Sequence, residues 1–309
     1  MGMILHVVTY LSLLIFVLAV AVRFHRIQKY PLHLRWEIYP VPHEGKRSEH
    51  GGSRLEDTDW WTKPRHTSRW RDMKFMIPEM LFLKALFEHN RKLWYRSFPF
   101  HFGLYLTAAF AFLLVVGSIL EMAGVASHGF AAPVMTLLTA VTTAVGLAGL
   151  TLAILGCAGL LVMRLSDADL KPYTNASHIF NLLFIMASLG LTLVAWLTVD
   201  RDFSLMGGYL ASLMTFRVSA PTGSALVSAA ILALSLLVAY IPLTHMSHFF
   251  VKWFTWDKIR WDDEPNVRGG RIEIMIQNSL KAPVSWAAEH IKADGKKNWV
   301  DVAIEEVDK

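Results

Sequence analysis

Two histidines, His101 and His248, stand where an imidazole could bind a metal inside a membrane. His101 lies near the start of the apolar stretch Phe98-Pro99-Phe100-His101-Phe102-Gly103, and His248 lies near the end of another, after Pro242. An ionisable residue inside an apolar segment is costly and is by default a functional candidate. Two imidazoles that face each other from neighbouring helices supply both axial ligands of a haem iron. The pair predicts a haem site, and buried, hydrogen-bonded histidines are the alternative that spacing alone leaves open.

The composition indicates a helical membrane protein. The chain has 309 residues, of which 54% are hydrophobic, and its mean hydropathy is +0.38. A helix needs about 20 apolar residues to cross a bilayer. Blocks of that length lie at about 4–22, 98–120, 134–163, 178–199 and 223–250. We therefore expect an all-α membrane protein, built as a five-transmembrane-helix bundle.

Two further features exclude alternatives within the class of helical membrane proteins. The first block has no basic segment before it, and Arg23, His25 and Arg26 follow it where a signal peptide would have a small-residue cleavage site. We therefore expect an uncleaved first helix. Cys157 is the single cysteine and lies within an apolar block, which argues against a disulfide framework or a thiolate metal site.

The distribution of basic residues predicts the orientation. Of the 30 lysines and arginines, 28 lie in segments 23–97, 164–177 and 251–309. Because basic residues favour the cytoplasmic side, the N-terminus is expected outside and the C-terminus in the cytoplasm. We expect a multi-pass protein of a bacterial or archaeal cytoplasmic membrane. The net charge of +5 then follows from this asymmetry, with no need for nucleic acid as a partner, and the basic segments are expected to meet anionic lipid headgroups.

This orientation gives the chain four expected parts. They are a first transmembrane helix (1–22), a cytoplasmic basic insertion (23–97), a four-helix core (98–250) and a cytoplasmic tail that docks on a partner (251–309). The pattern from Glu79 to Tyr95 predicts an interfacial amphipathic helix within the insertion. In the tail, the stretch 267–277 is expected to contain a short strand.

Other candidate residues lie at the predicted cytoplasmic boundary. His245 precedes His248 by three residues, about 60° away around a helix, so both cannot bind one iron. His245 is expected to be a substitute ligand or to hold a haem propionate. His178, at the start of the fourth block, is expected to contact a propionate or the interface. Arg96 and Arg164 would neutralise propionates, although ordinary boundary residues would look the same.

The third block contains four glycines that suit close approach. They are Gly146, Gly149, Gly156 and Gly159. Small residues let another helix, or a macrocycle, come close. Packing between helices is the preferred interpretation.

Two sequence elements carry a resemblance to a known family. These are Phe100-His101-Phe102-Gly103 and the spacing from Pro242 to His248, within a match over about 98–256. The chain resembles the gamma subunit of respiratory nitrate reductase and its relatives in sulfite-reduction-associated (Dsr), tetrahaem-cytochrome (Tmc) and heterodisulfide-reductase-like complexes. The stretches 32–37 and 258–263 look like the Dsr/Tmc branch. The resemblance implies five spans, with haem b between the second and the fifth.

One departure from the family pattern bears on the number of haems. Relatives with two haems have further histidines at the positions that Ala111 and Ala230 occupy here. The resemblance therefore implies that the outer haem is missing and the cytoplasmic-side haem is kept. A second haem would need other ligands, and His6 and His128 are the only histidines near the predicted outer face.

The resemblance implies a haem b subunit that transfers electrons between quinone or menaquinone and a cytoplasmic iron–sulfur partner of the heterodisulfide-reductase type. Such a subunit is not catalytically complete alone. Polar residues near the headgroups are candidates for the quinone site: His6, Glu121, His128, Asp200 and Arg201 outside, and Lys92, His178 and Arg164 inside. An inner site lies closer to a single inner haem and is preferred.

Two other functions are compatible with the sequence. One is an electron conduit from a periplasmic multihaem cytochrome c to the cytoplasmic partner, which needs a second haem near the outer face. The other is a haem-free membrane anchor or small transporter. The spans carry no charges at mid-membrane and show no inverted repeat, which argues against the transporter.

Overall fold

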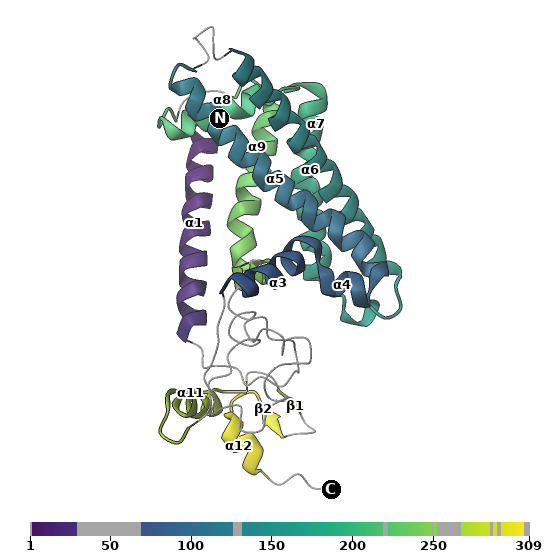
Figure 1. Cartoon of the computed structure of the whole chain (residues 1–309), viewed down its shortest axis with the longest axis vertical. Coiled ribbons are helices and arrows are strands. Elements are labelled where there is room, and N and C mark those ends of the chain that lie inside the picture. Colours follow the sequence, from purple (N-terminus) through teal and green to yellow (C-terminus); the bar gives the residue numbers. More distant parts are fainter. Residues whose placement is uncertain are drawn as a thin grey trace. The chain divides into compact units, whose positions relative to one another are not determined.

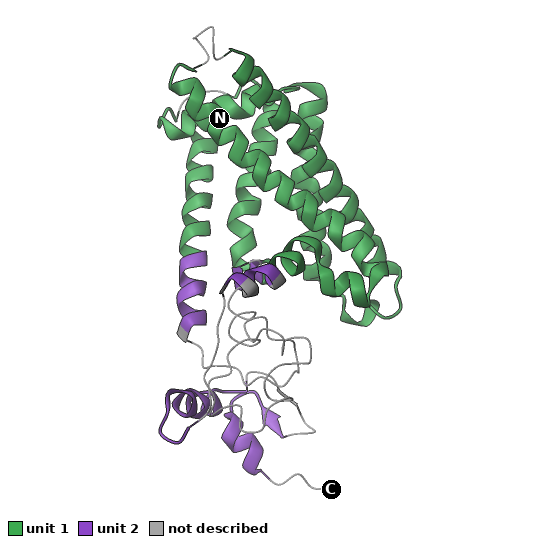
Figure 2. Cartoon of the chain, viewed as in Figure 1, with its two compact units in different colours: residues 1–19, 77–246 green, residues 20–76, 247–309 purple. Residues whose placement is uncertain are grey.

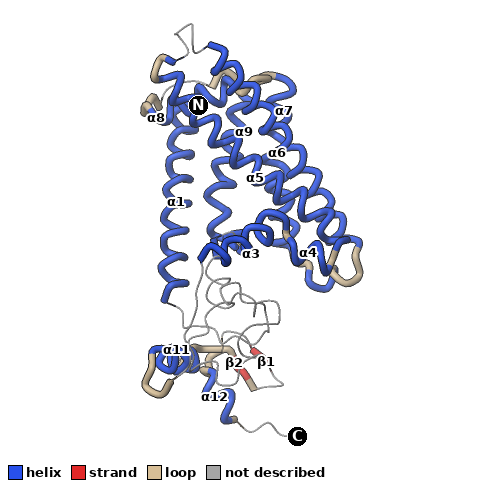
Figure 3. Tube along the Cα trace, in the orientation of Figure 1, coloured by secondary structure: helices blue, strands red, loops and turns tan. Residues whose placement is uncertain are grey.

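The protein is mostly helical (Figure 3). The computed structural model describes residues 2–29, 69–125, 132–218, 222–248, 250–251, 267–284, 287–288 and 292–305. Within these ranges five helical segments are long and apolar enough to cross a membrane: α1 (Gly2–Lys29), α5 (Arg91–Met122), α6 (Ala132–Ser166), α7 (Ala176–Thr198), and α9 (Ala225–Tyr240) together with the 3₁₀ turn Ile241–Leu243 that follows it. The expectation of a mostly helical chain with five helices that could cross a membrane is confirmed, and these helices are compatible with a multi-pass membrane protein.

The chain divides into two compact units (Figure 2). Residues 1–19 and 77–246 form the first unit, which contains four of the five long helices and the first two thirds of α1. Residues 20–76 and 247–309 form the second unit. His101 and His245 therefore belong to the first unit, and His248 belongs to the second.

The helices of the first unit run alternately up and down (Figure 1). At the lower end, as drawn, α5 and α7 begin and α6 and α9 end. At the upper end α1 begins, and the short helix α8 (Ser204–Met214) lies between α7 and α9 in sequence. A 3₁₀ turn, Lys171–Tyr173, lies in the lower connection from α6 to α7.

The predicted interfacial helix from Glu79 to Tyr95 is helical but broken. It comprises the end of α3 (Arg69–Phe82), α4 (Lys84–His89) and the start of α5. Leu83 interrupts it in a left-handed conformation (φ 52°), and Asn90 ends α4 and caps α5 by accepting a hydrogen bond from the Leu93 amide. As a result α5 begins at Arg91, seven residues before the expected start of the second apolar block.

Helices α5 and α6 are packed backbone to backbone. A Cβ placed on Gly156 would lie 2.3 Å from the amide nitrogen of Phe100, and one placed on Gly103 would lie 2.3 Å from that of Ala153. Gly149 is also too close for a side chain, with its Cβ position 2.8 Å from the Thr107 nitrogen. The α6 glycines therefore pack helix against helix, as the sequence favoured. The glycine of the Phe100–Gly103 stretch has the same packing role.

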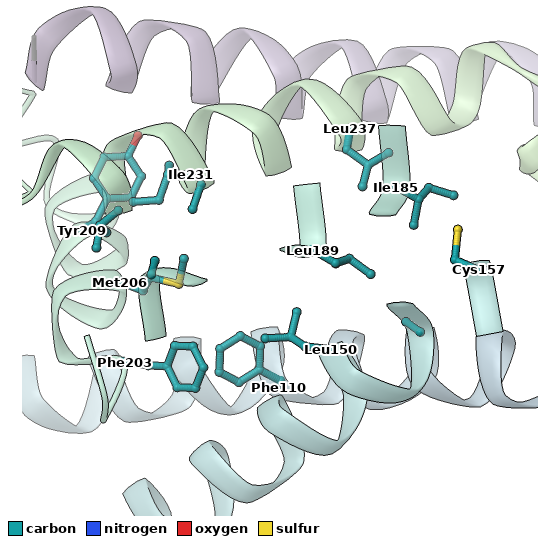
Figure 4. Packing of buried hydrophobic residues seen from close by; sticks show 14 of the residues in the cluster. Phe110, Leu150, Cys157, Ile185, Leu189, Phe203, Met206, Tyr209, Ile231 and Leu237 are labelled. Carbon is teal, nitrogen blue, oxygen red and sulfur yellow. The ribbon is translucent and has the colours of Figure 1, made fainter. Parts of the chain in front are cut away.

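A buried apolar core fills the space between α5, α6, α7, α8 and α9 (Figure 4). Leu150, Leu189 and Cys157 are almost completely buried, and the rings of Phe110 and Phe203 lie 4.5 Å apart. The Cys157 thiol donates to the Leu182 carbonyl oxygen at 3.0 Å. This core holds the long helices in one fixed arrangement.

The tail of the second unit differs from the prediction. Residues 271–280 form helix α11 (Arg271–Leu280), so the short strand expected within 267–277 is wrong. The alternation Ile272-Glu273-Ile274 suggested a strand, but Ile272 is buried while Ile274 is exposed, and Met275 and Ile276 share the inner face with Ile272. The remaining elements are the antiparallel strands β1 (Ala287–Ala288) and β2 (Ala293–Asp294), and helix α12 (Trp299–Ile304).

The contact between α5 and α6 can be tested with two matched glycine substitutions. Gly156→Ala forces a methyl group onto the backbone of α5, and overpacking of this kind costs about 1–3 kcal/mol. Gly190→Ala on α7 meets open space and should stabilise its helix by about 0.5–1 kcal/mol. We expect thermal unfolding in detergent to show a lower Tm for the first variant only. Equal Tm values would contradict the packing assignment.

Candidate functional site

His101 is oriented as a metal-binding imidazole would be. Its Nδ1 donates to the Ser97 carbonyl oxygen at 2.8 Å, with the Ser97 hydroxyl 3.2 Å away. Because a carbonyl oxygen only accepts, the ring proton lies on Nδ1, and Nε2 keeps its lone pair. A hydrogen bond from the other ring nitrogen is the usual second-shell support of a metal-binding histidine. His101 is partly buried and can act as an iron ligand through Nε2.

The position of His101 follows from the packing of α5. Its neighbour Phe100 is buried, and the Phe100 backbone lies against Gly156 of α6. The Phe100 ring stands nearly perpendicular to the imidazole, with centroids 5.1 Å apart. The glycine contact thus fixes the turn of α5 that carries His101.

The proposed partner, His248, lies in the second unit, so its pairing with His101 stays a prediction. Its local setting differs from the expected one, because α9 ends at Tyr240 and two 3₁₀ turns follow, Ile241–Leu243 and His245–Ser247. Pro242 lies in the first of these turns, where its ring and missing N–H end the helix. The 60° separation of His245 and His248 around a helix therefore does not apply.

His178 and His245 are brought together with two residues that the sequence reading missed. The rings of His178 and His245 are nearly perpendicular, with centroids 5.4 Å apart. The His245 Nε2 lies 3.4 Å from the Asn181 amide nitrogen, and the Tyr240 hydroxyl donates to the Asn181 amide oxygen at 2.7 Å. We call these four residues, at the lower ends of α7 and α9, the polar cluster. Asn181 was detectable as the lone amide in an apolar block.

The two arginines of the candidate site lie at the lower ends of α5 and α6. Arg96 donates to the Lys92 carbonyl oxygen at 2.6 Å, and its side chain lies along α6, 3.3 Å from the Cβ position of Gly159. Arg164 is partly buried in the last turn of α6. Contact of either one with a haem propionate stays a prediction.

Lys92, an inner quinone candidate, is held in an ion pair. Its ammonium lies 2.5 Å from the Asp167 carboxylate. This hydrogen bond is the main cause that lowers the pKa of Asp167, and the Asp169 backbone N–H adds to it. The pair ties the start of α5 to the loop that follows α6.

The outer candidate His6 is enclosed in a buried hydrogen-bond network. It is 0% exposed, its Nδ1 lies 2.8 Å from the Gly2 carbonyl oxygen, and its Nε2 lies 2.7 Å from the Ser212 hydroxyl. One turn along α1, the Thr9 hydroxyl contacts those of Tyr209 at 2.7 Å and Ser235 at 2.9 Å. Both ring nitrogens of His6 are therefore engaged, Nδ1 within α1 and Nε2 with α8, while Thr9 connects α1 to α8 and α9.

The remaining outer candidates have structural roles or a boundary position. Asp200 is 2% exposed and accepts from the backbone amides of Leu205 and Met206 at 2.9 and 3.1 Å, which caps α8. Arg201 donates to the Leu197 carbonyl oxygen at 3.1 Å. Glu121 is exposed at the end of α5.

Some predicted features lie outside the described residues. They are His128, the Dsr/Tmc-like stretches 32–37 and 258–263, and most of the basic insertion.

Comparison of the chain with protein-family models, with curated proteins and with solved structures finds no match.

The ion pair between Lys92 and Asp167 predicts a pH-dependent stability. A carboxyl whose folded pKa is lowered stabilises the fold above its unfolded pKa of about 3.9, and this is lost as pH falls through the folded value. Asp167→Asn should therefore lower the Tm at pH 7, and the difference from wild type should shrink below about pH 4. Asp169→Asn, in the same loop, is the control. A pH-independent difference would contradict the assignment.

Proposed function

We propose that this protein is the membrane-bound haem b subunit of a respiratory redox complex, which transfers electrons between a membrane quinone and a cytoplasmic iron–sulfur partner. The main support for the proposal is the orientation and the tautomer of the His101 imidazole. Its Nδ1–H is held by the Ser97 carbonyl oxygen, so Nε2 can bind iron from within an apolar helix. The resemblance of Phe100–Gly103 and of the Pro242–His248 spacing to the nitrate reductase gamma family points to the same group.

The residues present suit a haem. His101 supplies one neutral imidazole, and His248, which follows the fifth long helix, would supply the second. Arg96 and Arg164 would face the propionates, because guanidinium groups bind carboxylates well. His245 is reassigned from this site to the polar cluster, given its contact with Asn181. A bis-histidine haem is a one-electron carrier whose potential depends on its ligands, their hydrogen bonds and its burial.

We place the lower end of the bundle at the cytoplasmic face, with the N-terminus outside and the tail inside, because 28 of the 30 basic residues lie in the segments that this assigns to the cytoplasm. The membrane would be the cytoplasmic membrane of a bacterium or archaeon. The tail, 251–309, would dock on a heterodisulfide-reductase-like iron–sulfur subunit. No nucleic acid is involved.

The electron balance defines what the chain must do. Oxidation of a quinol to a quinone releases two electrons and two protons. The electrons pass singly to the iron–sulfur partner, and the protons leave to water at the membrane boundary. Quinone reduction is the reverse, and the chain needs its partner for either direction.

A conduit from a periplasmic multihaem cytochrome c receives less support from the geometry. It needs a second haem near the upper end, and His6 already uses both ring nitrogens in hydrogen bonds to Gly2 and Ser212. The other histidine proposed for that haem, His128, lies outside the described residues. One haem per chain is therefore the proposed stoichiometry.

Haem counting in purified variants tests the ligand assignment. His101→Ala and His248→Ala should each lose the reduced α-band and most of the haem in a pyridine haemochrome assay, because a vacant axial position weakens the iron site. His89→Ala, on the exposed end of α4, should keep one haem per chain. Full haem in both ligand variants would overturn the assignment. A wild-type chain without haem would favour a membrane anchor.

A further inference from the structure

We propose that the polar cluster of His178, Asn181, Tyr240 and His245 is the binding site for the headgroup of an isoprenoid quinone. This inference rests on the proposed function, which requires a quinone but does not say where it binds. All four residues belong to the first unit and lie where α7 begins and α9 ends.

The cluster is a connected polar group at the edge of an apolar bundle. Asn181 is its centre, 4% exposed, with Tyr240 on its amide oxygen and His245 beside its amide nitrogen. His178 precedes Asn181 by three residues, so the two side chains share a face of α7. The perpendicular ring contact of His178 with His245 closes the group.

Two donor hydrogens of the cluster have no acceptor among the described residues. The Asn181 amide nitrogen carries two hydrogens, and its one contact there is with His245. The His178 Nδ1 accepts from the Asn175 backbone N–H at 3.4 Å, which places the ring proton on Nε2. Asn181 is buried, and a buried N–H without an acceptor is costly, whereas His178 is partly exposed. A carbonyl oxygen bound between Asn181 and His178 would accept both hydrogens.

The chemistry of the cluster selects a neutral carbonyl ligand. Its members are two imidazoles, an amide and a phenol, and none carries a permanent charge. Phosphate and carboxylate are held by arginine and lysine, which pair with their charge. Two basic residues at the lower end of α5, Lys92 and Arg96, are engaged with Asp167 and with the backbone of α5. The carbonyl of a quinone is a strong acceptor without charge.

The apolar surroundings suit the rest of a quinone. The Tyr240 ring lies edge-on to Phe180 and Phe184, at centroid distances of 5.6 and 5.5 Å, and these two phenylalanines lie 5.7 Å apart. Phe180 is 53% exposed, and Leu243 is also exposed. An aromatic surface beside polar donors holds a planar headgroup, and the exposed apolar side chains face the lipid where an isoprenoid tail would lie.

The experiment measures quinone binding directly, separately from electron transfer. Purified protein in lipid nanodiscs is titrated with a short-tailed naphthoquinone, and binding is followed by quenching of tryptophan fluorescence. Asn181→Leu removes the central donor while keeping a side chain of similar shape. It should raise the Kd by about tenfold, which is the effect expected for the loss of one buried hydrogen bond. Tyr240→Phe keeps the ring but removes the hydrogen bond to the Asn181 amide oxygen, and should raise the Kd by a smaller factor.

Tyr105→Phe is the matched control, because that phenol also makes one hydrogen bond, to the Met80 carbonyl oxygen, far from the polar cluster in sequence. Its Kd should equal that of wild type. Haem content, measured on the same samples, reports folding and should stay at one per chain in all variants.

The outcomes separate the site from the function. Wild-type affinity in both cluster variants, or haem-loaded wild type without saturable quinone binding, overturns the site and leaves the haem assignment standing. Quinone binding that depends on Asn181 in a chain without haem supports the site and overturns the proposed function. Loss of binding in Tyr105→Phe as well would overturn the site, because the effect would not be local.

Discussion

The contact of α5 with α6 is the constraint on which the rest of the first unit depends. The two helices approach so closely that the positions of Gly103, Gly149 and Gly156 admit no Cβ. In lipid, helices gain no hydrophobic energy from association, so close backbone packing of this kind holds them together. It fixes the rotation of α5, and with it the direction of His101. The lower end of α6 likewise places Arg164 and the loop that carries Asp167.

The histidines within the helices are of two kinds, which differ in how many of their ring nitrogens the fold itself binds. His6 is completely buried, and both of its nitrogens contact partners from its own helix and from α8. Its role is to attach α1, whose other side chains are largely apolar and exposed. His101 and His178 each have one ring nitrogen committed by the fold. A histidine oriented through one nitrogen is prepared to use the other on a ligand.

Much of the architecture could be predicted from the sequence, because hydropathy and length alone identify the long helices. The helix boundaries could not, since local capping decides them: Asn90 starts α5 ahead of the apolar block, and Pro242 ends α9 before His245. The tail helix α11 was misread because Ile272-Glu273-Ile274 fits both periods, and only burial of Ile272 and not Ile274 separates them. His101 was found by its type and setting. Tyr240 was missed because its role depends on Asn181, 59 residues away.

The two ends of the bundle differ in how many hydrogen-bonding groups of their polar side chains are paired within the fold. At the upper end, His6 and Asp200 make hydrogen bonds that hold α1 and α8. At the lower end, the His178 Nε2–H and an Asn181 N–H have no acceptor among the described residues, and the His101 Nε2 is the nitrogen that we propose binds iron. Evolution tolerates such groups in an apolar setting chiefly where a ligand completes them. If the proposed haem and the proposed quinone lie at this same end, the electron path between them is short, which it would not be for a quinone at the upper end. This asymmetry is the physical reason why we place the proposed redox chemistry where α5 and α7 begin.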